Sequence, residues 1–201
     1  MHPSLKLFMT CLCLVILAGC GVTQPSKFYL LTSVEGSDTA AMTTPGPALG
    51  LGPISFPAYL DRPEIVHRSS NHELHFAGSH RWAEPLKTSF IRSLAENLSI
   101  QLPTNRVTRY PWPRSTMYDY QIILDVTRFD ADASGTVILS ASWEIIEADG
   151  KTVSHRQKAT YSEPAGSMDY STIVAAQSRA VGRLSRDIVM AIERSRKPSV
   201  Q

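Results

Sequence analysis

The stretch Tyr118-Asp119-Tyr120-Gln121-Ile122-Ile123-Leu124-Asp125-Val126-Thr127 decides how this chain folds. Apart from Ile123, apolar and polar side chains alternate along it. Side chains with a period of two lie on opposite faces of a β-strand, so one face would be buried and the other solvated. The stretch therefore predicts a half-buried strand.

The residues that follow predict a meander of three antiparallel strands. After a turn at 130–135, a second alternation runs through Val137, Leu139, Ala141, Trp143 and Ile145. Asp149-Gly150 is a strong two-residue hairpin signal, and 153–161 reads as a more polar third strand. Shorter strands are predicted upstream, at 27–32, 49–56, 64–68, 73–77 and 106–110.

Two segments have the period of an amphipathic helix. The first runs from about Glu84 to Gln101, has apolar residues at every fourth position and is ended by Pro103. The second begins near Ser167 or Met168 and continues to about Arg194. Two such helices must cover one face of the sheet. We therefore predict one α+β domain over 27–194, a two-layer sandwich of an antiparallel sheet and two helices.

The N-terminus resembles that of a bacterial lipoprotein. Lys6 and the apolar run Leu7–Leu17 have the charge and length of a secretory signal, and Leu17-Ala18-Gly19-Cys20 resembles a lipobox. The pattern predicts a signal peptide at 1–19, lipidation of Cys20, a lipidated tether at 20–26 and a disordered tail at 195–201. An ordinary signal peptide with an accidental cysteine, or a short buried helix, is the alternative. Sorting in lipoproteins of this kind implies delivery to the outer membrane, since Gly21, not Asp, follows the cysteine.

Composition argues against several classes of function. The formal charge is +2, which is too balanced to suggest a nucleic-acid partner. Cys11 and Cys13 would leave with the signal peptide, so no disulfide or cysteine metal site is expected. The five histidines from His67 onward have no metal-ligand spacing, and no G-x-S-x-G, G-x-G-x-x-G or P-loop run occurs. We therefore expect neither an enzyme nor a cofactor.

Three short segments are candidates for a docking surface for a partner protein. Prolines bracket Tyr59-Leu60-Asp61-Arg62 and also Trp112, so we expect these side chains to be partly exposed. Arg81-Trp82 comes just before the first helix, where a hydrophobic staple is the simpler reading of Trp82. Aromatic residues are enriched at binding hot spots. The alternative is that these segments are corners that only shape the fold.

Taken together, these runs resemble the PqiC (YmbA) family, which are auxiliary lipoproteins of ABC-type transport systems. The resemblance rests on the lipobox, 28–31, 51–54, 57–63, 81–86, 125–130 and Trp143, in that order. It implies an outer-membrane lipoprotein that works with a periplasm-spanning MCE-domain protein and inner-membrane components to move lipids. It also implies a docking role without catalytic residues, with several copies in a ring as one arrangement. A periplasmic lipoprotein that holds an apolar ligand in its own cavity remains the rival.

Overall fold

Three long strands form the frame of the sheet. They are β6 (Tyr120–Ala131), β7 (Thr136–Glu147) and β8 (Val153–Pro164), and each is antiparallel to the next. The computed structural model describes residues 25–33, 46–102 and 104–196. The meander predicted from the alternating sequence is confirmed.

The other edge of β6 is shared by two groups of short strands. Along its first half it pairs with β2 (Leu49–Ser55), and β5 (Val107–Arg109) lies beyond β2. At its end it pairs with β3 (Glu64–Arg68), followed outward by β4 (Leu74–Trp82) and β1 (Lys27–Tyr29).

The sheet is mixed, so the prediction of an antiparallel sheet was wrong for part of it. The pairs β1–β4, β2–β5, β2–β6 and β3–β6 are parallel. Alternation along a sequence predicts a strand but not the direction of its neighbour. Parallel neighbours need long connections, and α2 (Leu86–Gln101) provides one between β2 and β5.

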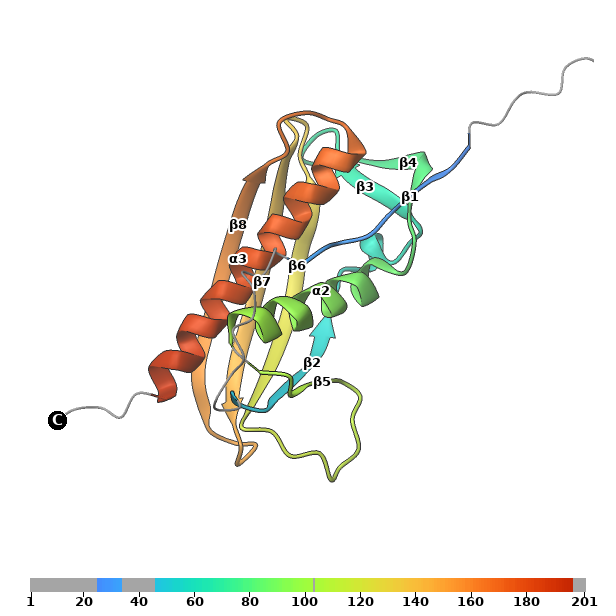
Figure 1. The fold of residues 1–201 in the computed structure, drawn as a ribbon. Coiled ribbons are helices and arrows are strands. Elements are labelled where there is room, and N and C mark those ends of the chain that lie inside the picture. The colour runs from blue at the N-terminus through green and yellow to red at the C-terminus, as the bar shows by residue number, and fades with distance from the viewer. Residues whose placement is uncertain (1–24, 34–45, 103, 197–201) are drawn as a thin grey trace, which may run out of the picture.

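Both helices lie on the same face of the sheet, which confirms the two-layer α+β sandwich (Figure 1). The predicted apolar stripe of α2 is buried: Leu86, Phe90, Leu94 and Leu98. So is that of α3 (Tyr170–Arg196): Ile173, Ala176, Ala180, Leu184, Ile188 and Ile192. Neither helix has an apolar stretch long enough to span a membrane, as far as the described residues go.

An aromatic cluster joins the two layers. The ring of Phe90 on α2 lies 5.5 Å from that of Phe129 on β6 and 5.0 Å from that of Phe56, both edge to face. Such pairs stabilise a core beyond the area that they bury. Phe56 comes just before the short 3₁₀ helix η1 (Ala58–Leu60), so this cluster also holds the start of the proline-bracketed segment.

One backbone position in β2 requires glycine. Gly52 has a φ of +124°, and a Cβ placed there would lie 2.6 Å from the Cβ of Tyr110. Real Cβ atoms do not approach so closely, and L-residues avoid this φ. Glycine therefore allows β2 to lie close to Tyr110, directly after β5.

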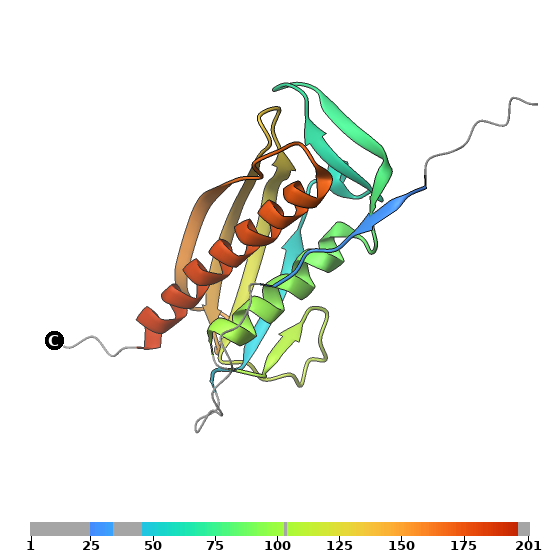
Figure 2. The same ribbon diagram turned by 45° about the horizontal axis from the view of Figure 1, so that its top comes forward.

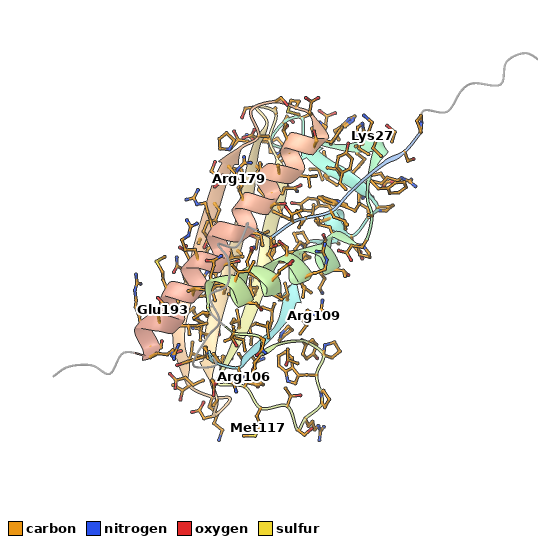
Figure 3. All side chains as sticks on the ribbon, in the orientation of Figure 1. Lys27, Arg106, Arg109, Met117, Arg179 and Glu193 are labelled. Carbon is orange, nitrogen blue, oxygen red and sulfur yellow. The ribbon has the colours of Figure 1, made fainter. Side chains whose placement is uncertain are left out.

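The strands outside the meander lie at two ends of the molecule. The β3–β4 hairpin and β1 occupy one end, while β5 and the loop after it occupy the other (Figure 2). Figure 3 shows Lys27 at the first end and Arg106, Arg109 and Met117 at the second. This separation decides which of the predicted docking residues lie together.

Candidate docking site

Two of the predicted docking segments meet at the hairpin end. The segment 57–63 turns through η1 and enters β3, and 81–85 leaves β4 and enters α2. The backbone N–H of Trp82 donates a hydrogen bond to the carbonyl of Pro63 at 2.7 Å. This bond joins parts of the chain that are about 20 residues apart in sequence.

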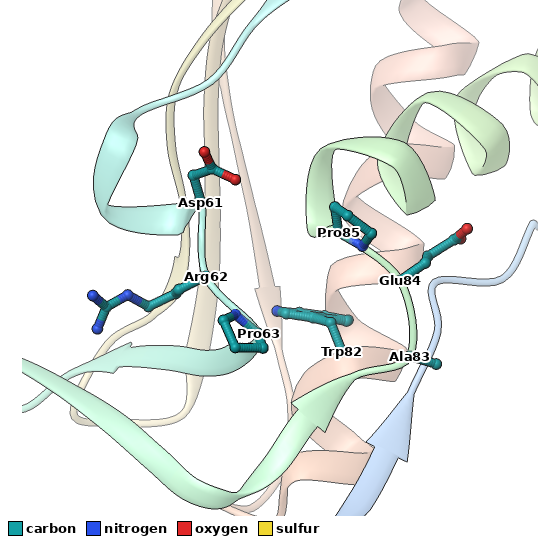
Figure 4. A pocket seen from close by; sticks show the side chains of 7 residues that line it. All are labelled: Asp61, Arg62, Pro63, Trp82, Ala83, Glu84 and Pro85. Atoms are coloured by element: carbon teal, nitrogen blue, oxygen red, sulfur yellow. The ribbon is translucent and has the colours of Figure 1, made fainter.

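A pocket of about 320 Å³ lies between these two segments (Figure 4). Its walls combine the indole of Trp82 with two prolines and bear carboxylates at their margin. The lining residues are Asp61, Arg62, Pro63, Trp82, Ala83, Glu84 and Pro85. A second pocket, of about 260 Å³, adjoins it through Asp61 and is lined also by Phe56, Ala58, Leu60 and Lys87.

Leu60 and Trp82 are too deeply buried to form an exposed docking surface by themselves. They are 3% and 5% exposed. The expectation that Leu60 is partly exposed was wrong, because η1 turns its side chain into the core in spite of the flanking prolines. Trp82 packs in the same core and lines the main pocket, while Leu60 lines the second pocket, so each residue both stabilises the fold and shapes a pocket.

Tyr59 is tied to a carboxylate that the sequence did not reveal as important. Its hydroxyl donates a hydrogen bond to Asp130 at 2.6 Å, and Asp130 is fully buried at the end of β6. Arg68 and Arg128 each place Nε within 3.0 Å and 2.9 Å of the other oxygen of that carboxylate. We call Tyr59, Arg68, Arg128 and Asp130 the Asp130 network.

The Asp130 network fastens the proline-bracketed segment to the sheet. Burial, followed by the hydrogen bond to Asp130, raises the pKa of Tyr59 to about 12. Its hydroxyl therefore remains a donor throughout the physiological range. In the sequence, the signal for this network is the acidic Asp130 between the core residues Phe129 and Ala131. Tyr59 and Arg68, which bind Asp130, come from distant segments, so the sequence alone does not identify them.

Most charges around the main pocket are already paired. Arg81 forms an ion pair with Glu64 at 3.0 Å, and Glu84 forms one with Arg92 at 2.9 Å. The guanidinium of Arg62 lies 3.8 Å above the ring of Phe76, and Figure 4 shows this side chain directed away from Trp82.

Asp61 differs from these neighbours. Its side chain is exposed, and no cation within the described ranges forms an ion pair with it. Its carboxylate can therefore pair with a positively charged group that enters the pocket.

Trp112 lies apart from the other candidates. It belongs to the loop after β5, at the opposite end of the sheet from the hairpin. Its ring packs edge to face against Tyr110 at 5.3 Å and Tyr118 at 5.5 Å. In this second aromatic group Trp112 and Tyr118 are half-buried and Tyr110 is exposed, and none of the three lines the pocket.

Cys20, predicted to carry the lipid, lies outside the described residues. The histidines near the hairpin form ring contacts: His67 with His75 at 4.7 Å, and His80 with Tyr170 at 4.2 Å. In the part of the chain that the structure describes, no three or more His, Cys, Asp or Glu side chains gather as metal ligands.

Comparison with known proteins gives the class: a helix-covered sheet of this kind, matched to a family of transport components. The chain belongs to the family described as ABC-type transport auxiliary lipoprotein component, whose model matches residues 29–189. This confirms the resemblance seen in the sequence. The family consists of auxiliary components of transporters and is not a known family of enzymes.

Similar proteins support the assignment. The chain is 28% identical over 140 residues to the intermembrane transport lipoprotein PqiC of Escherichia coli, and equally to that of Shigella flexneri, covering 69% of this chain and 73% of either relative. A crystal structure of a protein from Xanthomonas campestris shares the fold with a TM-score of 0.67 at 20% identity, covering 85% of this chain and 98% of the other. Another crystal structure, of an uncharacterized protein, has a TM-score of 0.69 at 20% identity, covering 84% and 99%.

Proposed function

We propose that this chain is the outer-membrane lipoprotein of an intermembrane lipid transport system, and that it serves as a docking adaptor for an MCE-domain protein. Membership of the auxiliary lipoprotein family and similarity to PqiC support this role. The observation that carries it is the convergence of 57–63 and 81–85 on one pocket. Lipid on Cys20 would hold that pocket beside the bilayer and raise its effective concentration for a membrane-side partner.

The pocket's chemistry suits a protein side chain. Trp82, Pro63 and Pro85 offer an apolar wall of the kind that takes an aliphatic or aromatic anchor. The exposed carboxylate of Asp61 would attract a lysine or arginine next to that anchor. We therefore expect the partner segment to combine an apolar residue with a basic one.

The pocket is formed in advance of binding. The Asp130 network fixes 57–63 to β6, and the Trp82–Pro63 hydrogen bond joins 81–85 to 57–63. A surface that is already ordered loses less conformational freedom when a partner binds. This favours the hypothesis that the two segments dock a partner over the hypothesis that they only shape the fold.

The experiment places a large charged side chain at the edge of the pocket without disturbing the core. Ala83 is exposed and lines the pocket, and Ala133 is an exposed alanine in the β6–β7 turn. Ala83→Arg should abolish co-purification of the MCE-domain protein with the lipidated chain from native membranes in mild detergent. The matched variant Ala133→Arg should retain it.

Each result separates the hypotheses. Equal recovery with both variants would remove the pocket as the docking site, and no recovery with the wild-type chain would reject the adaptor role. Native mass spectrometry tests the rival lipid-binding role, for which a co-purified lipid is expected. The same spectra would count the subunits of a ring.

A further inference from the structure

Exposed apolar side chains gather on the outermost strands of the hairpin end. Phe28 of β1 is 64% exposed, and Leu30 and Phe76 are also exposed. Single exposed apolar residues are ordinary on protein surfaces. Three such residues on adjoining strands at one end of a molecule are less so.

Register and contacts place Phe28 and Phe76 on one face of the sheet, with Phe76 further along β4. Phe28 pairs with Arg81, and partners in register project from the same face of a sheet. Arg81 binds Glu64 on that face at 3.0 Å. Arg62, two residues before Glu64, lies over the ring of Phe76. These side chains thus share one face of β1, β4 and the segment that enters β3.

These side chains lie close to the predicted lipid. Phe28 is eight positions after Cys20, and a fully extended chain covers at most about 3.5 Å per position. Phe28 therefore cannot be more than about 28 Å from the acylated residue. Lys27, exposed beside Phe28, adds a charge that suits anionic lipid headgroups.

We propose that Phe28, Leu30 and Phe76 form a membrane-facing edge that enters the headgroup region of the bilayer beside the lipid anchor. Apolar side chains on a bound surface penetrate about 5–10 Å to the boundary with the acyl chains. The inference rests on the proposed anchoring through Cys20. It fixes the orientation of the domain, with the loop that contains Met117 directed away from the membrane.

The test uses the lipidated full chain with one reporter at each end. Phe28→Cys and Met117→Cys, each labelled with an environment-sensitive fluorophore, are reconstituted into vesicles of phosphatidylethanolamine and phosphatidylglycerol with or without lipid-borne quencher. Met117 is 90% exposed, so both substitutions spare the core. We expect loss of emission for the label at position 28 and none for the label at 117.

Failure of the edge and failure of the anchor give different results. If the protein floats with the vesicles but neither label is quenched by lipid, the domain stands off the bilayer and the proposal is wrong. Iodide in the buffer serves as a second, aqueous quencher. If neither iodide nor the lipid-borne quencher reduces the emission of the label at position 28, a second copy covers the edge and the proposal is wrong. Labelling of the wild-type chain at Cys20, with no flotation, would reject the anchor itself.

Discussion

Replacing Asp130 with alanine should lower the free energy of unfolding by about 3 kcal/mol. The change removes the acceptor of two arginines and of the Tyr59 hydroxyl. Breaking a buried ion pair by deleting one partner costs about 3–5 kcal/mol, and the lower end applies because Arg68 and Arg128 still reach solvent. For a domain of this size the melting temperature should fall by about 6–12 °C.

Urea denaturation followed by circular dichroism measures this loss. The matched control is Asp125→Ala, which removes an exposed aspartate from the same strand. Tyr59→Phe removes one hydrogen bond to a carboxylate and should cost about 1.5 kcal/mol. In the double variant of Tyr59 and Asp130 the two losses should not add, because both act on one interaction.

Free energies of unfolding of Asp130→Ala and Asp125→Ala that lie within about 0.5 kcal/mol of each other would contradict this prediction. That result would mean that the arginines find equivalent partners in water and that the network does not hold 57–63 to the sheet.

Three further predictions concern other parts of the fold. Gly52→Ala should cost about 1–3 kcal/mol because of its positive φ and the clash described above, while Gly78→Ala, where nothing lies within 4 Å of the added Cβ, should be nearly neutral in the same denaturation assay. Leu60→Ser should cost about 2–5 kcal/mol, and an unchanged melting temperature would contradict its burial. Burial, followed by the charge of His75, lowers the pKa of His67. The contribution of neutral His67 to the free energy of unfolding should therefore be fully present above pH 6.5 and be lost as the pH falls below it. Urea midpoints at pH 7.5 and 5 check this, with a smaller fall expected for His67→Gln.

The sequence predicted the elements whose pattern is local. The strand β7 alternates along most of its twelve residues and β6 along its first half, and the buried faces of α2 and α3 repeat at helical spacing. Such patterns need no knowledge of the rest of the chain. The sequence did not predict that β2 and β3 share one edge of β6, because five- and seven-residue strands carry no signal of their partner or its direction.

The candidate site was predictable only in part, for the same reason. The prolines and aromatic residues marked 57–63 and 81–85, and the structure brings both to one pocket. That Leu60 is buried depends on how η1 turns, and the bond between Tyr59 and Asp130 joins residues 71 positions apart. Neither is visible in a short window of sequence.

The three-residue strand β1 gives the domain a mechanically weak link at its N-terminal end. A pull through Lys27 acts first on the short ladder between β1 and β4, whereas the twelve-residue strands of the meander lie on the far side of the sheet. Tension applied from the N-terminus would detach β1 first. The segment that precedes the domain would become longer, and the helix-covered layers would stay intact. Detachment of β1 would then relieve the tension before the core is strained.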